Sequence, residues 1–289
     1  MPRFKICGWR RPALVTMGAV LAAAMLLAAC GRDADRLSRH RGGFRDRSPA
    51  SQPTTSTSAS GLILASSFEQ PVCGRYHGPG QGCEFGVEGQ VRTGTFGCRT
   101  GDSCIEIERQ NYQAHMGVIS VTPLPGGNAF VGSAQRVPAI PGGALPSGGY
   151  LQLEQISPTD GSTVPGWPVE VRMYADRRLG LALFNGSAVA RTRWQAPVDR
   201  WFYIVLQVQN GVGATQRMWV YDENDHPVDQ VSIRLDTRQQ WAHGLRPADK
   251  IGGTNSTLVP MFTYADDWYI ATTNEGPLHI GPDGQPLSA

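Results

Sequence analysis

The chain has 289 residues, which is long for one domain and short for three. Its first 60 residues hold ten Lys or Arg and three Asp or Glu, whereas the remainder holds sixteen and twenty-one, so the net charge of +2 combines +7 with −5. The part that can fold is therefore acidic and lacks the basic face that phosphate binding needs, which argues against nucleic acid as a partner.

Residues 1–29 have the pattern of a bacterial lipoprotein signal peptide. Basic residues precede an apolar stretch at 13–29, which is the order of a secretory signal. The stretch ends in Leu27-Ala28-Ala29-Cys30. This tetrapeptide resembles the lipobox, and the resemblance implies cleavage before Cys30 and acylation of that residue, for example by palmitate. We therefore expect a lipid-anchored, extracytoplasmic protein of the cell envelope, with the membrane as a partner.

Two alternatives to this leader stay open. An uncleaved transmembrane anchor is one, because about 17 apolar residues are the short end of what spans a bilayer. Twin-arginine export is the other, since Arg10 and Arg11 precede the apolar stretch.

Residues 30–60 are expected to be a disordered linker. The stretch 31–47 mixes Arg and Asp with Gly, and 48–60 is almost wholly Ser, Thr, Pro and Ala. Neither stretch can bury enough apolar surface to offset its ordering entropy. The linker would tether the domain that follows.

Residues 61–289 are expected to form one domain, which contains Cys73, Cys83, Cys98 and Cys104. In an oxidising compartment these cysteines predict two disulfides, with three possible connectivities. The short separations favour Cys73 with Cys83 and Cys98 with Cys104, because a smaller loop closes at less entropic cost. Zinc is the alternative, but the spacings lack the close pairs usual in tetrahedral thiolate sites.

Short stretches that alternate apolar and polar residues recur along this domain and end at Gly, Pro, Asn or Asp. Twelve short strands in 229 residues predict an all-β fold, a two-sheet antiparallel sandwich. The expected strands are 61–68, 85–91, 104–109, 116–122, 150–156, 169–174, 179–184, 189–194, 201–209, 216–221, 229–235 and 267–273.

Three of these strands present an unusual polar face. In 150–156, 169–174 and 216–221 the aliphatic side chains share one face, and aromatic, Arg and carboxylate side chains share the other. Such a face can stack sugar rings and hydrogen-bond their hydroxyls. Ordinary cross-strand pairs, or cover by a long 123–149 loop, are the alternative. The predicted ligand groove consists of Gln152, Glu154, Arg172, Tyr174, Arg217, Trp219 and Tyr221.

Four segments resemble strands of a concanavalin A-like jelly roll. They are 179–186, 198–209 with Trp201 opening a long buried strand, 216–222, and the closing segment 264–272. That superfamily includes laminin-G-like lectin modules and polysaccharide lyases. The resemblance implies a jelly-roll sandwich over about 66–280 and a polysaccharide or glycan ligand.

Lyases of this shape carry a Gln-Ile-His-like triplet, in which the Gln neutralises the uronate carboxylate and the His transfers protons. By this resemblance the triplet corresponds to residues 152–154 or 155–157, and neither contains a His. Catalysis would have to use Tyr174, Tyr221 or His115 as the base. The related glucanases use carboxylates on one strand, a pattern that Glu106 and Glu108 match only in part.

Many jelly-roll sugar-binding modules open with a Phe-Glu pair, close with an Asp in the final strand, and hold calcium with these acidic groups. Phe68-Glu69 and Asp266-Asp267 resemble that arrangement. The resemblance implies a structural calcium ion held by Glu69, Asp266 and Asp267. Exposed charges beside edge strands are the alternative.

The sequence thus predicts a monomeric envelope lipoprotein that displays a glycan-binding β-sandwich. A polysaccharide lyase acting on uronate-containing glycans by β-elimination is the enzyme alternative. A structural envelope protein without a sugar ligand is the third. The missing His favours binding over catalysis.

Overall fold

The computed structural model divides the chain into two units, Met1–Gln52 and Pro53–Ala289. It describes residues 61–69, 85–88, 90–109, 114–118, 127–140, 149–158, 169–183, 189–238, 245–251 and 261–288, all in the second unit. The predicted signal peptide, the linker, Cys30, Cys73 and Cys83 lie outside the described residues. Among the described residues, no helix has the length and apolar character needed to cross a membrane.

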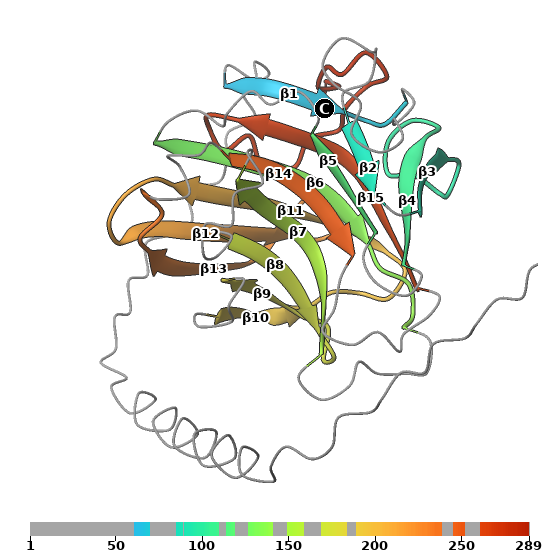
Figure 1. The fold of residues 1–289 in the computed structure, drawn as a ribbon. Helices are drawn as coiled ribbons and strands as arrows, with labels where there is room; N and C mark the ends of the chain where they lie inside the picture. Colours follow the sequence, from blue (N-terminus) through green and yellow to red (C-terminus); the bar gives the residue numbers. More distant parts are fainter. Residues whose placement is uncertain are drawn as a thin grey trace, which may run out of the picture. The chain divides into compact units, whose positions relative to one another are not determined.

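The described strands form two antiparallel sheets that lie one behind the other (Figure 1), which confirms the predicted all-β sandwich. Sheet A has the strand order β13-β12-β11-β6-β15-β4-β3, with β1 also paired to β15. Its strands are β1 (Leu62–Ser66), β3 (Gln90–Gly94), β4 (Cys104–Arg109), β6 (Asn128–Arg136), β11 (Trp201–Gln209), β12 (Ala214–Tyr221), β13 (Pro227–Leu235) and β15 (Met261–Ala271).

Sheet B has the strand order β10-β9-β8-β7-β14-β5-β2. Its strands are β2 (Phe85–Glu88), β5 (Ala114–Val118), β7 (Tyr150–Pro158), β8 (Val169–Tyr174), β9 (Arg178–Ala182), β10 (Val189–Gln195) and β14 (Leu245–Ile251). Neighbours in sheet order are often far apart in the sequence, as in a jelly roll.

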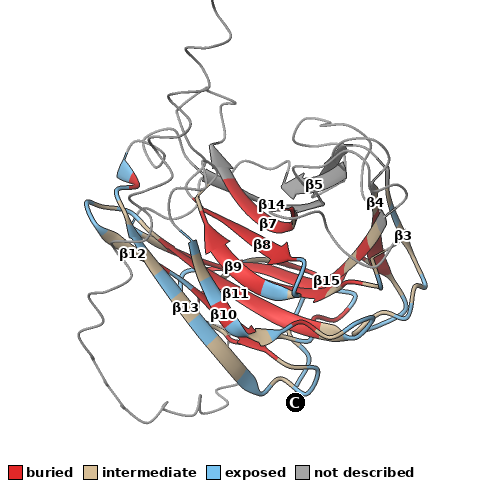
Figure 2. Cartoon of the chain, turned by 90° about the horizontal axis from the view of Figure 1, so that it is seen from below, coloured by how far each residue is buried: buried red, intermediate tan, exposed pale blue. Residues whose placement is uncertain are grey.

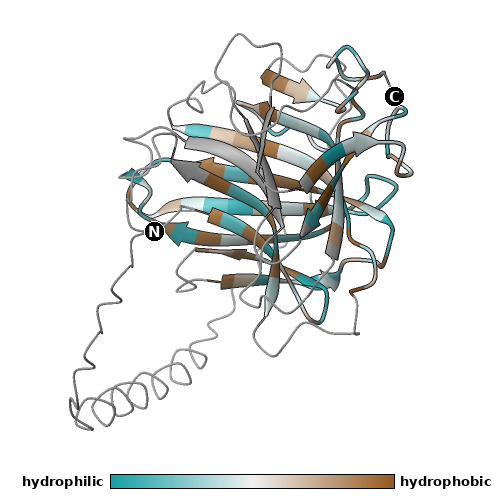
Figure 3. Cartoon of the chain, turned by 45° about the vertical axis from the view of Figure 1, so that its right-hand side comes forward, coloured by the Kyte–Doolittle hydropathy of each residue, from teal (hydrophilic) through white to brown (hydrophobic). Residues whose placement is uncertain are grey.

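The main core lies between the sheets. Hydropathy alternates along many strands (Figure 3), because successive residues point to opposite faces. The inward residues form one buried cluster that includes Leu151 and Val171 of sheet B and Ile204 and Val220 of sheet A. Burial is deepest in central strands such as β8, whereas β13 at the edge of sheet A keeps exposed positions (Figure 2).

A second apolar cluster lies on the other face of sheet A. Tyr203, Tyr221 and Tyr269 pack there with Ile280 from the segment after β15, and Trp219 packs against the same cluster. The Tyr203 hydroxyl donates to the carbonyl of Asp267 at 2.6 Å. The residues after the last strand therefore complete the fold.

Several strand predictions need correction. The predicted 123–149 loop contains β6, and β14 was not predicted at all. The predicted strand 85–91 is split between β2 in sheet B and β3 in sheet A, and the last strand begins at Met261 rather than at residue 267.

One of the two favoured disulfides can be checked, and it is present. Cys98 and Cys104 are bonded, with their Cα atoms 5.3 Å apart. The bond closes the turn that leads into β4.

Candidate functional site

The seven residues of the predicted groove lie on two different sheets. Gln152, Glu154, Arg172 and Tyr174 belong to sheet B, whereas Arg217, Trp219 and Tyr221 belong to β12 of sheet A. The aliphatic residues that alternate with both sets meet in the core between the sheets. The two polar faces therefore point away from each other, and one ligand groove cannot contain all seven residues.

Two of the three β12 residues, Trp219 and Tyr221, support the fold. Trp219 stacks at a tilt against Phe130, with ring centroids 6.2 Å apart, and Tyr221 is buried in the second apolar cluster. Burial raises the pKa of Tyr221, partly offset by a hydrogen bond with Asn274. Arg217 is exposed.

Glu154 also leaves the predicted face. The register between β7 and β8 shifts between Gln152 and Glu154, so that Glu154 pairs with Val171, a core residue. Its Oε2 accepts a hydrogen bond from the Ser133 hydroxyl of β6 in the opposite sheet, at 3.2 Å. Glu154 therefore lies inside the sandwich, because the bulge reverses the strict alternation assumed from the sequence.

The bulge brings Gln155 onto the outer face of sheet B in place of Glu154. Gln152 Nε2 donates to Gln155 Oε1 at 3.0 Å and also to Glu170. Arg172 donates to Glu170 Oε1 from Nε at 3.0 Å and to the carbonyl of Leu183 from Nη2 at 2.9 Å. We call these four side chains, Gln152, Gln155, Glu170 and Arg172, the polar row. All are buried, with Gln155 at 0% and Glu170 at 1% exposed.

Two tyrosines and two arginines stack beside the polar row. The Arg172 guanidinium lies 4.0 Å from the centroid of the Tyr150 ring, and the Arg191 guanidinium lies 3.6 Å from that of Tyr174. The two rings are 6.3 Å apart. We call this set, Arg172, Tyr150, Tyr174 and Arg191, the tyrosine column.

Gly180 makes room for the tyrosine column. It lies on β9, next to the edge strand β10, and pairs with Arg172 on one side and Arg191 on the other. A Cβ atom at this position would meet Tyr174 Cε2 at 2.6 Å. The glycine therefore lets the ring of Tyr174 lie against the sheet.

The charges of this face are unevenly balanced. Burial by itself would lower the pKa of Arg172, but the hydrogen bond and the charge of Glu170 outweigh it and raise the pKa. Burial, with Glu170 adding to it, raises the pKa of Tyr150. Arg191 is exposed, and within the described part of the chain no carboxylate forms an ion pair with it. The outer face thus has a neutral phenol, a compensated Arg172 and an uncompensated cation at Arg191.

Sequence reasoning placed Tyr150 and Glu170 on this face but gave no role to Arg191. Its strand, β10, matched the alternation pattern, yet an arginine at an exposed strand position is ordinary. Only the cross-strand register, which sets Arg191 beside Gly180 and under the Tyr174 ring, distinguishes it.

The residues considered for catalysis are dispersed. Glu106 is buried in sheet A and bound to Arg92 Nε and Nη2. Burial and a hydrogen bond to Glu106 raise the pKa of Tyr264. His115 lies in β5 of sheet B, opposite Lys250 of β14 and Glu88 of β2, and its side chain is outside the described part.

The three predicted calcium ligands already accept hydrogen bonds from protein groups. Glu69 Oε1 accepts from the backbone N–H groups of Asp102 and Ser103 at 2.8 and 2.9 Å. Both oxygens of Asp266 and both of Asp267 also accept protein donors. Among the described residues Glu69, Asp266 and Asp267 also do not form a group whose ligand atoms all lie within 4.8 Å of one another, so this set does not fit a calcium ion with its six to eight oxygen ligands.

Comparison with solved structures supports the sandwich topology. The marine PL-14 alginate lyase from Aplysia kurodai matches 65% of this chain and 89% of its own, with a TM-score of 0.51 and 13% identity. Lectin II from Ulex europaeus matches 73% of this chain and 98% of its own, with a TM-score of 0.48 and 8% identity. The sequence matches no family model and no curated protein. The fold is a concanavalin A-like β-sandwich.

Proposed function

We propose that this protein binds a glycan through the outer face of sheet B, on the tyrosine column. The observation that carries the proposal is the stack of Arg172, Tyr150, Tyr174 and Arg191 beside a hydrogen-bonded polar row. Within the column Arg191 is exposed and Tyr150 is only partly buried, whereas Arg172 and Tyr174 are buried and hold them in place. A sugar would therefore contact Tyr150 and Arg191, since sugar rings pack on aromatic rings and their polar groups bind exposed polar side chains. A glycan ligand is also in keeping with the fold, which is shared with an alginate lyase.

The charge of this face favours a carboxylated or sulfated glycan. Arg172 is already paired with Glu170, whereas Arg191 has no ion-pair partner among the described residues. An exposed guanidinium forms bidentate bonds with carboxylates and related anions. Arg191 is therefore the residue that we assign to the anionic group of the glycan.

A polysaccharide lyase is the second candidate. The residue types on the outer face, Gln152, Arg172, Tyr150 and Tyr174, suit the neutralisation of a uronate. The raised pKa of Tyr150 opposes it, because a phenol that holds its proton more tightly is a poorer base at neutral pH. Binding without turnover is therefore the preferred function.

The proposed tether delivers this module to the cell envelope through an acylated Cys30, with the membrane as partner. Changing Cys30 to Ala should leave the precursor unprocessed or release the protein from the membrane fraction. Unchanged fractionation and an unchanged N-terminal mass would refute the anchor without bearing on the glycan site.

A glycan array probed with the purified protein tests the proposed function. We expect retention on uronate-containing or sulfated glycans. Any polymer retained should then be incubated with the protein and followed by ultraviolet absorbance, because β-elimination creates an unsaturated uronate that absorbs. An increase in that absorbance would establish lyase activity. If no glycan is retained, the glycan-binding proposal is wrong, and a structural role without a sugar ligand becomes the preferred function.

A further inference from the structure

Four segments that are distant in the sequence meet at an irregularity in β15. The pairing of β15 with β6 shifts between Asp266 and Tyr269, and Asp267 has a φ of 47°, in the left-handed region. Asp266 and Asp267 are both 0% exposed. Two adjacent aspartates are thus buried beside the disulfide-closed turn 98–104, and a negative charge buried on either of them needs a compensating cation.

Protein groups occupy all four oxygens of this pair. Asp266 Oδ2 accepts from the backbone N–H groups of Arg99 and Thr100 at 2.8 and 3.0 Å, and Oδ1 accepts from the N–H of Asp267 at 2.8 Å. Asp267 Oδ1 accepts from the N–H of Ile280 at 2.8 Å, and Oδ2 accepts from the Thr100 hydroxyl at 2.7 Å.

The Arg99 guanidinium completes the cluster. Its side chain is 6% exposed, and Nη1 donates to Asp267 Oδ2 at 2.5 Å and to the carbonyl of Leu278 at 2.6 Å. Nη2 binds Asp225 in the turn between β12 and β13. The guanidinium also lies 5.0 Å from the centroid of the Tyr203 ring, whose face attracts cations. One arginine therefore joins the disulfide turn, the β15 bulge, the β12–β13 turn and the C-terminal segment.

We infer that the guanidinium of Arg99 is the structural cation of this cluster, held by Asp225 and by Asp267, one of the carboxylates that the sequence assigns to calcium, so that this site needs no divalent metal. A metal ion at Asp267 would have to displace Thr100 and Arg99 from the same oxygen and would face a positive charge at hydrogen-bond distance. The guanidinium, in contrast, carries donors whose planar geometry matches the oxygens around it.

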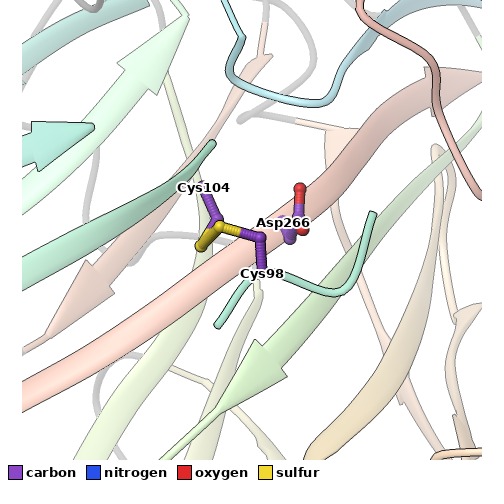
Figure 4. A group of neighbouring side chains, drawn as sticks. All are labelled: Cys98, Cys104 and Asp266. Carbon is purple, nitrogen blue, oxygen red and sulfur yellow. A yellow bond between two sulfur atoms is a disulfide. The ribbon is translucent and has the colours of Figure 1, made fainter. Parts of the chain in front are cut away.

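The disulfide keeps this cation in place. Cys98 and Cys104 bracket Arg99 and Thr100, and their sulfur atoms lie beside Asp266 (Figure 4), with the ligand atoms of the three residues within 4.8 Å of one another. As a disulfide, the two sulfurs are not the thiolates that a metal requires. The turn therefore supplies a fixed arginine rather than a ligand set.

Thermal unfolding of the purified full chain tests the inference. Its midpoint should be the same in chelator and in millimolar calcium, whereas a calcium ion bound at a hundredfold excess over its Kd would raise the midpoint by roughly 5 to 10 °C. Arg99→Met should lower the midpoint by roughly 6 to 20 °C, because it leaves a buried carboxylate without its cation. Arg99→Lys, which keeps the positive charge, should lower the midpoint by less than Arg99→Met does.

A double-mutant cycle separates this role from ordinary packing. Asp267→Asn added to Arg99→Met should lower the midpoint by less than the two single losses combined, since the second change removes the charge that the first leaves unbalanced. Arg136→Met is the matched control, because Arg136 packs on Trp201 and Tyr264. The fall in midpoint of the Arg136→Met, Asp267→Asn double variant should equal the sum of the two single falls. A calcium-dependent rise in the natural protein, or additive losses for Arg99 and Asp267, would overturn the inference.

Discussion

Glu170 shows how single side chains hold the proposed binding face. Its carboxylate is 1% exposed and binds Gln152 from one strand and Arg172 from its own. The charge of Arg172 is therefore used within the protein, and its guanidinium is fixed against Tyr150. A rigid backing of this kind leaves the outer positions, above all Arg191, to contact a ligand.

Arg172→Met should destabilise the domain by about 3 to 5 kcal/mol, because it removes the buried cation that faces Glu170. Equilibrium unfolding in urea measures this change. Arg178→Met is the control, since Arg178 is 46% exposed and only 3.8 Å from Asp176, and exposed pairs of this kind contribute about 0 to 1 kcal/mol. Equal losses of unfolding free energy in the two variants would show that the buried Arg172–Glu170 pair stabilises the domain no more than an exposed ion pair does.

Gly180→Ala should cost about 1 to 3 kcal/mol, because its Cβ would overlap Tyr174 Cε2. The same substitution in a Tyr174→Ser background should be nearly neutral, as the ring that causes the overlap is gone. Urea unfolding of the four proteins decides this. If the loss persists without the ring, the backbone rather than the tyrosine column requires the glycine.

At the scale of elements, the sequence predicts strands that alternate large apolar and polar residues and fails where other patterns are used. β6 is buried along its length between β11 and β15, and it uses small residues such as Ala129, Gly132 and Ala134. A side chain at Gly132 would collide with the Tyr269 ring. A central strand covered on both faces therefore has no period-two signal. β14 contains a proline and three charged residues, so it also lacks the alternating pattern from which strands are predicted.

The candidate site depends on the same limitation. Alternation correctly placed Gln152, Arg172 and Tyr174 on one face of sheet B. It failed at Glu154, because a bulge after Gln152 cannot be read from residue types. It also could not tell which strands share a sheet, so it joined β12 to β7 and β8. Sheet order depends on long-range pairing, which local patterns do not encode.

The Cys98–Cys104 disulfide should stabilise the domain by about 2 to 3 kcal/mol, as expected for closing a short loop in the unfolded chain. The paired Cys98→Ser and Cys104→Ser substitutions should lower the urea midpoint accordingly. Reducing the natural protein is a less specific test, because it acts on every disulfide. An unchanged urea midpoint would mean that the carboxylates around the 98–104 turn keep the turn in place without the disulfide.

At the scale of the whole molecule, the buried carboxylates make stability depend on pH. Burial, with the charge of Asp267 adding to it, raises the pKa of Asp266 to about 8, whereas an unfolded aspartate titrates near pH ~4. The folded state then binds more protons than the unfolded state across this window. Stability should therefore fall as pH rises from about 4 through about 8.

Thermal midpoints of the purified protein at pH 6 and pH 9 measure this effect, and the midpoint should be lower at pH 9. Asp266→Asn should flatten the profile between these values, because it removes the titrating group while keeping an oxygen that accepts the N–H bonds of Arg99 and Thr100. A profile equally steep in the variant would assign the dependence to another group.

The central claim, that an anionic glycan binds the outer face of sheet B at Arg191, is tested most directly by calorimetric titration of a glycan retained on the array. Two exposed arginines on different sheets give a matched pair: Arg191 of β10 stacks on Tyr174, whereas Arg217 of β12 lies on the outer face of sheet A. Arg191→Ala should raise Kd roughly 10- to 150-fold, the effect of losing about 1.5 to 3 kcal/mol from a charge-assisted hydrogen bond. Arg217→Ala should bind like the natural protein. Equal affinity for Arg191→Ala and the natural protein would contradict the account.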